Sequence, residues 1–535
     1  MLNYIWLTLL FLGIGVGLTT DILNETSNKY MNGEPLYVIV KFETDDIDST
    51  KTNKAKIFIS STVFNEFYRT GEKDTIWHSA NLTFNKSTKN FAMFLETNDS
   101  SPRIWKEMST VNGKENDLTG RIILRDKVDP FHYTATLFLE NISFIKMKSV
   151  TNAAIDYAAN AVKIALGLIG IMALWLGIMK IAEESGLIKV IAKSVKPVTK
   201  FLFPDVPHDH PAIGSMIMNI SANMLGLGNA ATPFGLKAME ELDSINPTKG
   251  IATNAMCTFL AINTAGLTLI PATAIAIRAS AGSSDPTIII GTSFFGALCA
   301  TLTGITAAKV LEKFSIPNFN FRNWIKSNLK FLVSFFFSAS VIILLFLSGA
   351  LSIISAETVK SIIQVVSTLA IPLIIFFFII YGVIRNVKIY EVFVEGAKEG
   401  FNIAVRIIPF LVAMLVAIGI FRTGGAMDYL IIILSPITNL IGMPAEAMPM
   451  ALMRPLSGSG SLGIMSEIIS VHGPDSFLGI LVSTIMGSTE TTFYVLALYF
   501  GAVNIKKTRH AVAAGVLADI AGILAALFIV RLIFH

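Results

Sequence analysis

The sequence is short of charge. Lys, Arg, Asp and Glu make up 15% of its 535 residues, whereas about a quarter of an ordinary soluble domain is charged. The net charge of +4 comes without a long basic run, which argues against nucleic acid as a partner. Hydrophobic residues make up 53% of the chain, more than a water-soluble core requires. The composition therefore predicts a protein whose main solvent is lipid.

Cysteine and the common catalytic motifs are also scarce. Cys257 and Cys299 both lie in apolar runs, so we expect neither disulfides nor structural zinc. There is no GxxxxGK[ST] or GxSxG motif and no clear nucleophile–base pair, so we expect no enzyme, no ATP-driven step and no cofactor. The run His208-Asp209-His210-Pro211 resembles a metal clip. Two histidines without a third ligand are more typical of a helix start with Pro in its first turn, and we expect no metal site.

The N-terminal 150 residues fall into two parts. Residues 3–19 form an uncharged apolar run without a basic leader or an A-x-A end, which predicts a retained transmembrane helix over residues 1–20. A cleaved signal peptide is the alternative. Residues 21–150 contain no run long enough to span a membrane. Alternating stretches there, separated by turn formers, predict a small β domain at Leu36–Phe42, Lys56–Ile59 and Thr134–Leu139.

From residue 151 onward the chain is almost entirely apolar. This predicts an all-α polytopic membrane protein, divided into a first repeat at 151–315, a linker with connecting helices at 316–389 and a second repeat at 390–535. The long apolar runs lie at about 157–179, 252–278, 287–309, 329–354, 358–384, 401–421, 475–502 and 511–534.

The two repeats share an order of features. Ser185-Gly186-Leu187-Ile188 followed by Pro197 matches Gly424-Gly425-Ala426-Met427 followed by Pro436. Each is followed by a Met-rich segment interrupted by Gly, Ser or Asn, at 216–232 and 451–463, and then by a Thr-bearing apolar helix, at 262–274 and 485–497. Four matching features in one order predict an internal duplication.

Lysine and arginine positions predict the orientation of the repeats. Five lysines between Lys180 and Lys200 mark a cytoplasmic end, whereas the equivalent region at 422–445 holds only Arg422 and is expected outside. Lys506, Lys507 and Arg509 mark an inside end again. The repeats are therefore expected to have inverted topology, with the β domain extracytoplasmic. Inverted repeats with broken helices are typical of transporters, which bind their solute near the midplane.

The broken segments hold the first candidates for a binding site. Backbone that is not helical at membrane depth must be buried in protein or line a cavity, as in re-entrant hairpins. A Gly/Ser turn that opens a helix suits a carboxylate or phosphate. Tight packing through small residues is the alternative. The candidates are Asn219, Asn223 and Asn229 in the first repeat and Arg454, Ser457, Ser459 and Ser461 in the second.

Arg454 and Glu490 are the strongest single signals, because a charge inside a membrane costs about 2.5–3.5 kcal/mol on insertion scales. We expect the two to face each other; a purely structural ion pair, a direct contact of either with substrate, or a coupling proton on Glu490 remain open. Asp519 and Arg406 lie in spans but near their ends, where snorkelling is cheap. The further candidates beside Glu490 are Thr489, Thr491 and Thr492, and those at the matching place in the first repeat, around Leu267, are Asn263, Thr264 and Thr268.

Several long stretches carry a family resemblance. ALWLGIMKIAEESGL at 173–187, the run at 209–242 and the run at 259–278 resemble bacterial spore maturation protein A. YEVFVEGAKEGF at 390–401, MALMRPLSGSGSLG at 450–463 and the run at 474–511 resemble spore maturation protein B. The chain resembles a fusion of the two, within the nucleoside-recognition or Gate superfamily. The resemblance implies a bacterial cytoplasmic membrane protein, and it does not cover residues 20–150.

These observations favour a secondary transporter or channel for a small polar, anionic metabolite. Arg454 and the Gly/Ser turn would hold the anion, Asn219 and Asn223 would select it, and Glu490 would pair or couple. The alternative is a membrane scaffold for envelope or spore maturation that acts through partners bound by the 20–150 insert. The expected partners are the lipid bilayer and a small molecule or ion; a homo-oligomer and envelope partners stay open.

Overall fold

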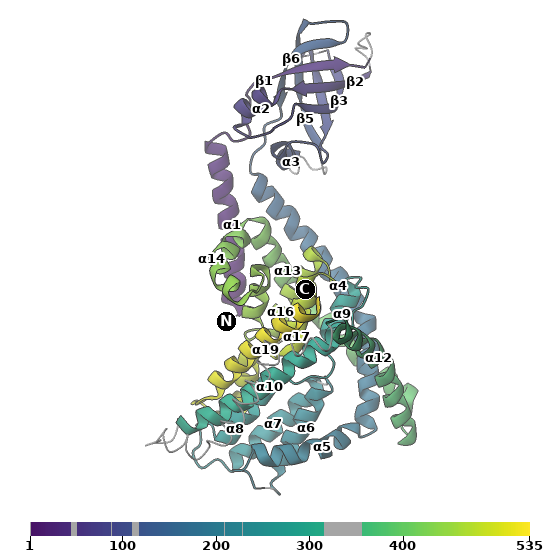
Figure 1. The fold of residues 1–535 in the computed structure, drawn as a ribbon, viewed down its shortest axis with the longest axis vertical. Helices are drawn as coiled ribbons and strands as arrows, with labels where there is room; N and C mark the ends of the chain where they lie inside the picture. Colours follow the sequence, from purple (N-terminus) through teal and green to yellow (C-terminus); the bar gives the residue numbers. More distant parts are fainter. Residues whose placement is uncertain are drawn as a thin grey trace. The chain divides into compact units, whose positions relative to one another are not determined.

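The computed structural model describes residues 2–43, 51–86, 88–109, 117–207, 209–226, 228–314 and 356–534 (Figure 1). They divide into two compact units. One contains the described parts of 6–157 and 416–430, and the other contains residues 2–5 and the described parts of 158–415 and 431–534. The apolar run expected at 329–354 lies outside the described residues.

The first unit contains a closed antiparallel β-barrel, in which each strand pairs with its neighbours in sequence and β1 closes on β6. Buried and exposed residues alternate along β1, as a strand with one face in the core requires. The predicted β domain is confirmed, with the first strand at the predicted bounds and the other two longer than predicted. The strands are β1 (Leu36–Phe42), β2 (Thr52–Ile59), β3 (Ile76–Asn85), β4 (Asn90–Glu96), β5 (Asp117–Lys127) and β6 (His132–Leu139).

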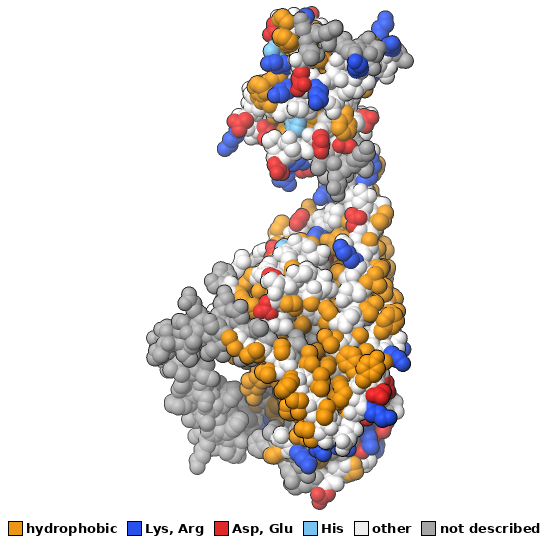
Figure 2. All heavy atoms as spheres, turned by 90° about the vertical axis from the view of Figure 1, so that its right-hand side faces the viewer, with side chains coloured by type: hydrophobic (Ala, Val, Ile, Leu, Met, Phe, Trp, Pro, Cys, Tyr) orange, Lys and Arg blue, Asp and Glu red, His pale blue; other side chains and the backbone are white. Residues whose placement is uncertain are grey.

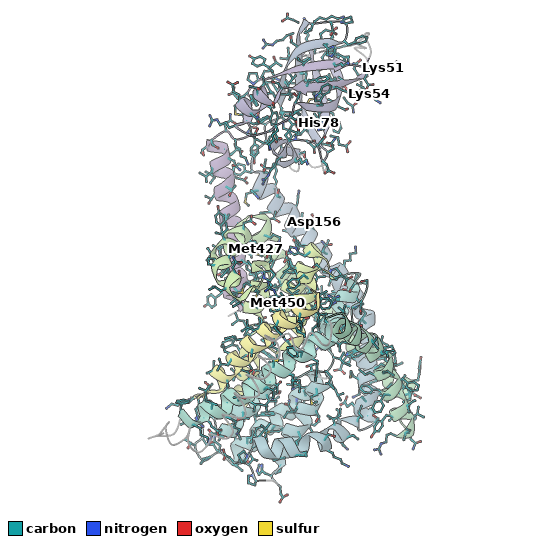
Figure 3. All side chains as sticks on the ribbon, viewed as in Figure 1. Lys51, Lys54, His78, Asp156, Met427 and Met450 are labelled. Atoms are coloured by element: carbon teal, nitrogen blue, oxygen red, sulfur yellow. The ribbon has the colours of Figure 1, made fainter. Side chains whose placement is uncertain are left out.

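Two short helices complete the barrel core. α2 (Ser61–Tyr68) contributes Phe64 and α3 (Arg103–Ser109) contributes Trp105, and both side chains are fully buried with their rings packed edge to face. His78 of β3, labelled in Figure 3, is buried with its Nε2 2.5 Å from Ser101 Oγ. Burial lowers the pKa of His78, and a backbone hydrogen bond with Ser79 only partly opposes this. The barrel core therefore holds a buried histidine that is neutral near neutral pH.

The rest of the described chain is helical. In the described residues, six helical segments are long and apolar enough to cross a membrane: α1, α4, α10, α13, the α17–α18 pair and α19. Figure 2 shows hydrophobic side chains over much of the helical part on one face, as a lipid-facing surface requires. The helices are α1 (Leu2–Thr26), α4 (Ile145–Glu184), α5 (Leu187–Leu202), α6 (Pro211–Met224), α7 (Gly228–Ser244), α8 (Asn254–Ala265), α9 (Ala272–Ser280), α10 (Ile289–Phe314), α12 (Ala356–Ile384), α13 (Ile389–Thr423), α14 (Ala426–Ile441), α15 (Met448–Met453), α16 (Gly458–His472), α17 (Phe477–Ser488), α18 (Thr492–Ala502) and α19 (Ala511–Phe534), with a 3-10 turn at Ala445–Ala447.

The expectation of continuous apolar helices at 262–274 and 485–497 was wrong. α8 ends at Gly266, whose φ of +61° is left-handed, and α9 begins only at Ala272. α17 likewise ends at Ser488 and α18 begins at Thr492. Hydropathy does not detect the first break because the residues that form it are apolar or small. A glycine in a left-handed conformation is the usual end of a helix.

The two segments expected to be broken are helical hairpins. α6 and α7 are separated at Leu225–Gly226, and α15 and α16 at 454–457. The predicted helix start at Pro211 is confirmed: His210 is the N-cap and its Nδ1 accepts a hydrogen bond from the Ala212 amide. His208 lies outside the described residues.

Hydrogen bonds tie the breaks of each repeat together in the same way. Leu269 N donates to Met224 O at 2.9 Å in the first repeat, and Phe493 N donates to Pro455 O at 3.0 Å in the second. Between the repeats, the α8 and α17 breaks meet where Glu490 N donates to Thr264 O at 2.9 Å. Backbone N–H and C=O groups at the breaks thus form hydrogen bonds with one another, as is required inside a membrane where water is not available.

The ends of α8–α9 and α17–α18 that lie away from the breaks also contact each other across the repeats. α8 begins beside the end of α18, where Ala252 N donates to Lys507 O. α17 begins beside the end of α9, where Arg278 contacts Asp475. The spans α8–α9 and α17–α18 therefore pass each other in opposite directions.

Candidate functional site

A cavity of about 500 Å³ lies inside the helical unit. Its walls are α4, α13 and the breaks of the four broken helical segments. Five of the candidate residues line it: Asn223, Thr268, Arg454, Thr489 and Glu490. The other lining residues are Met172, Leu176, Lys180, Glu183, Gly226, Ile270, Pro271, Ala272, Thr273, Ala274, Glu399, Ile403, Gly458, Met486 and Gly487.

Arg454 follows the last turn of α15 and is 3% exposed. Its amide donates to the carbonyl of Met450, which is labelled in Figure 3, so the guanidinium is held at the end of a half-helix. The Nη2 atom donates to the carbonyl oxygen of Thr489, and Nη1 donates to Thr491 Oγ1 at 3.3 Å. Nε has no hydrogen-bond partner among the described residues. The arginine therefore neutralises the carbonyl end of α17, and its Nε is the donor that no described residue accepts from.

Glu490 lies opposite, with Oε2 3.7 Å from Arg454 Nη2, as the sequence analysis expected. Half of its side chain is exposed, in contrast to the buried arginine. Its side chain also lies against Gly266, where a Cβ would clash with Glu490 Cγ. The glycine thus permits both the left-handed end of α8 and the close approach of the second repeat.

The Gly/Ser turn opens α16, as predicted. Ser457 is the N-cap, and its Oγ accepts from Gly460 N at 3.0 Å. Ser461 is fully buried and donates back to Ser457 O, while Ser459 Oγ lies 3.4 Å from Ser457 Oγ. These serines build the turn, and Gly458 is the member of the turn that lines the cavity. First-turn amides have no partner within their own helix, so this backbone can donate to a bound anion.

The polar candidates of the first repeat separate into two groups. Asn223 lines the cavity and donates to Asn263 Oδ1 at 3.0 Å, and Thr268 lines it beside them. Asn219 is fully buried away from the cavity, where its Nδ2 donates to Ala231 O and to Tyr499 Oη. Thr264 contributes its backbone oxygen rather than its hydroxyl, which donates to Ala261 O. The backbone of Asn229 lies in α7, but its side chain is outside the described part.

Three charged lining residues were not among those predicted from the sequence. Lys180 and Glu183 of α4 form an ion pair at 3.2 Å, and Glu399 of α13 lies in the same lining. With Arg454 and Glu490, the cavity has two cationic and three acidic side chains. All three missed residues lie at the charged ends of long apolar helices, where a sequence pattern does not separate snorkelling from lining.

Asp519 corrects the sequence analysis, which placed it near the end of a span with access to water. It is 1% exposed, and Oδ2 accepts from Thr492 Oγ1 at 2.6 Å. The residue lies in the third turn of α19, which packs along α8, α10 and α17. Snorkelling is therefore blocked by protein on this side. The sequence feature that could have indicated this burial is a single acidic residue inside a long apolar run.

A second ion pair joins the repeats at the outer end of the broken spans. Arg278 is fully buried and its Nη2 lies 2.9 Å from Asp475 Oδ1. Burial alone would raise the pKa of Asp475, but hydrogen bonds from Ser283 and Ser284 and the Arg278 charge outweigh it and lower the pKa. The carboxylate stays ionised and fixes the α16–α17 loop to the end of α9.

Broken half-helices around a polar cavity, together with six candidate spans among the described residues, define a multi-pass membrane protein. The nucleoside recognition (Gate) family model matches residues 165–281 and 404–506. The chain therefore belongs to the nucleoside recognition family, which is not a known enzyme family.

Two relatives from Bacillus subtilis (strain 168) each match about a third of the chain. Spore maturation protein B is 52% identical over 173 residues, which is 32% of this chain and 97% of that protein. Spore maturation protein A is 44% identical over 168 residues, 31% of this chain and 84% of that protein. Inner membrane protein YjiG of Escherichia coli (strain K12) is 30% identical over 82 residues, 15% of this chain and 54% of that protein. The matches are consistent with a fusion of the two spore maturation proteins.

Proposed function

We propose that this protein is a secondary transporter or channel for a small polar solute that carries an anionic group. The observation that carries the proposal is the cavity between two antiparallel broken spans, with the buried guanidinium of Arg454 in its wall. Broken helices are tolerated at membrane depth where they line a cavity, and transporters place solute sites there.

The chemistry of the wall supports an anionic group on the solute. Arg454 keeps its Nε without a partner in the described residues, and Gly458 brings the first turn of α16 to the same cavity. A guanidinium and the amides of a helix N-terminus are complementary to carboxylate or phosphate. Asn223 and Thr268 add neutral polar groups from the other repeat, so they are suited to select among anions.

The acidic side chains set a condition on this solute. Two cationic groups face three carboxylates in the lining, so an anion on its own would add to an existing excess of negative charge. Carboxylates in the wall repel an anion that enters without positive charge. We therefore propose that the anionic group arrives with positive charge, either on the same molecule or as a co-transported cation.

Inverted topology follows as part of the proposal. α8–α9 and α17–α18 pass in opposite directions, and the loops at each end of them carry different charges. Lys506 and Lys507 meet Gly250 at one end, which the positive-inside rule places in the cytoplasm. Arg278 and Asp475 meet at the other end, which would be outside. The same rule places the β-barrel, which precedes α4, on the outer side.

Scaffolding through the barrel is the second candidate, because the barrel carries exposed large apolar side chains. Tyr37, Ile39 and Trp77 are 58%, 44% and 60% exposed. Isolated apolar side chains are normal on surfaces, but a cluster marks a contact site. Removal of residues 25–148 from the full protein separates the candidates: a scaffold loses its cellular role, and a transporter keeps solute binding in the helical unit.

Ligand-induced stabilisation tests the proposed function. We expect one member of a panel of nucleosides, di- and tricarboxylates and amino acids to raise the melting temperature of the purified protein. A ligand at 100 times its dissociation constant stabilises by about 2.7 kcal/mol. Arg454→Ala should abolish this response, and Arg454→Gln, which can still donate to Thr489 O, should weaken it.

The matched control is Arg406→Ala. Arg406 is an exposed arginine of the apolar helix α13, outside the cavity lining, so its removal should leave the response intact. A response that Arg454→Ala and Arg454→Gln both retain in full would contradict the assignment of Arg454 to the solute.

A further inference from the structure

We propose that Asp519 is the binding site for one monovalent cation, Na⁺ or a proton, taken up together with the solute. The coupling to the solute rests on the proposed function, whereas cation binding by Asp519 does not. The site lies on α19, next to the α17–α18 break. Residues of this break line the cavity, whereas Asp519 does not.

Asp519 is a buried carboxylate with one partly open oxygen. Oδ2 accepts from Thr492 Oγ1, while Oδ1 is buried and has no hydrogen-bond partner among the described residues. Buried polar atoms without a partner are rare and each requires an explanation. A proton or a small cation at Oδ1 supplies one.

The surroundings of Asp519 offer further oxygen atoms. Gly515, one turn before Asp519, lies against the Thr492 side chain and Thr264 Oγ1, and Gly522, one turn after it, lies against the methyl group of Thr489 and the carbonyl oxygen of Ser488. Thr489 Oγ1 is itself buried without a hydrogen-bond partner in the described residues. Hard cations prefer oxygen ligands, and transporters use carbonyls and half-helix ends for Na⁺ or H⁺. The two glycines allow this oxygen-rich break to approach α19 closely.

The charges around Asp519 also favour the binding of a cation. The charged groups that act on Asp519 are Arg454 and Glu490, which have opposite sign and lie 3.7 Å apart. The N-terminus of α18 adds about half a positive charge. Asp519 therefore leaves an excess of negative charge inside the membrane, which one monovalent cation removes.

The other elements packed against α19 do not remove this excess. α8, α17 and α18 contain no Asp, Glu, Lys or Arg, and their titratable groups are Cys257, Tyr494 and Tyr499. α10 has Cys299 in its middle, and its charged groups lie at its C-terminal end. α12 also packs against α19, but its side chains at Glu357 and Lys360 are outside the described part. The charged residues of α10 are Lys309, Glu312 and Lys313.

Adjacent residues connect the cation site to the cavity. Thr491 accepts from Arg454, and the next residue, Thr492, donates to Asp519. A cation at Oδ1 neutralises the carboxylate and weakens the hydrogen bond that Oδ2 accepts from Thr492, next to the three-residue break that also holds Arg454. This is a route by which cation and solute binding favour each other.

A purely structural role predicts a different behaviour. In that case Asp519 serves as a fixed negative charge at the α18 N-terminus, and Asp519→Asn lowers stability equally in all salts and at all pH values. A cation site instead predicts that the variant loses a dependence that the wild type has.

The experiment is thermal unfolding of the purified full-length protein without solute. One arm replaces choline chloride by NaCl at constant ionic strength, and the other varies pH in choline chloride. For Na⁺ we expect the wild-type melting temperature to rise and saturate with NaCl, and Asp519→Asn to be flat. For a proton we expect no Na⁺ response, but a pH dependence of the melting temperature that Asp519→Asn reduces, which leaves only the part contributed by other groups such as His78.

Glu467→Gln is the matched control. Glu467 is a fully buried membrane carboxylate on α16, and its neutralisation should leave the cation response in place. If Asp519→Asn does not fold, Thr492→Val, which removes only the hydroxyl partner of Asp519, should show a reduced cation response.

Identical Na⁺ and pH dependence in the wild type and the Asp519 or Thr492 variant would overturn the proposal. That result would leave the Arg454-dependent response to solute standing, so the two failures are distinguishable. Conversely, loss of the solute response alone would leave Asp519 as a cation site without a transported anion.

Discussion

At the scale of single residues, the α17–α18 break is held between an arginine and a carboxylate on opposite sides of the same three residues. Arg454 donates to the carbonyl end of α17, and Asp519 accepts from Thr492 in the first turn of α18. Opposite charges at opposite half-helix ends match the dipoles of the two halves. Because both side chains are nearly inaccessible to water, their electrostatic effect on the break is large.

Some of the charged residues at the site could be predicted from the sequence, and others could not. Arg454 and Glu490 could be predicted because each interrupts an apolar run close to glycine, serine or threonine. Asp519 could not be separated from a snorkelling acid, because its burial depends on α8, α10 and α17 packing around α19. Asn219 looked equally polar in the sequence, yet it packs between α7 and α18 instead of lining the cavity.

His78 gives a pH prediction for the barrel. Its pKa in the folded state is lowered by burial, so the unfolded chain takes up a proton below about pH 6.5 while the folded barrel does not. Stability of the barrel should therefore fall as the pH drops through that value and be insensitive to His78 above it. Hydrogen-exchange mass spectrometry of β3 peptides in the full protein measures the opening free energy. His78→Gln should remove this pH dependence, and an unchanged profile would rule out His78 as its source.

At the scale of elements, one wall of the cavity depends on glycine contacts between α4 and α13. A Cβ at Gly400 would lie 2.5 Å from Met172 O and 2.7 Å from Ala173 Cα, and Gly396 meets Leu176 O in the same way. Small residues let helix backbones approach closely in membranes. The cavity residues Lys180 and Glu399 are carried by these two helices. Their spacing therefore depends on this contact.

Gly400→Ala should consequently destabilise the helical unit. The added methyl group meets backbone atoms that cannot rotate away, and overpacking of this kind costs about 1–3 kcal/mol. Gly170→Ala on α4 is the matched control, because its Cβ would meet open space and alanine is the better helix former by about 1 kcal/mol. Thermal unfolding of both variants should show a lower melting temperature for Gly400→Ala only. Equal melting temperatures would mean that α4 and α13 are not in close backbone contact.

Among the elements, hydropathy predicted the spans but not all of the breaks. The Gly/Ser turn before α16 carries polar residues, and asparagines in α6 and α7 flank the break after α6, so both sequences indicated interruption. The α8–α9 break is made of Gly266, apolar residues and Pro271, and its backbone is satisfied by the α6–α7 break. That pairing is a tertiary property, which a local pattern does not contain. The barrel strands were partly predicted because alternation marks a strand with one buried face.

At the scale of the whole molecule, the duplication is expressed as reciprocal contacts. Each repeat contributes one hairpin and one broken span, and the breaks of each pair are joined by backbone hydrogen bonds. The outer loops are joined across repeats, by Arg278 with Asp475 at one end and by Lys507 with Ala252 at the other. The sequence showed the order of these features and their lysine asymmetry, whereas the crossing of the spans needed the structure.

Cysteine accessibility in cells tests the membrane orientation that this crossing supports. In a background with Cys257 and Cys299 replaced by alanine, single cysteines at exposed positions report the side of the membrane: Lys54→Cys in the barrel (Figure 3), Lys193→Cys in α5, Asn439→Cys in α14 and Lys506→Cys after α18. We expect an impermeant thiol reagent to label the cysteines at 54 and 439 in intact cells. The cysteines at 193 and 506 should react only after permeabilisation, because the lysine-rich ends stay in the cytoplasm. Residues 193 and 439 lie in α5 and α14, the corresponding helices of the two repeats, so labelling of both from one side would contradict inverted topology, whichever side the barrel is on.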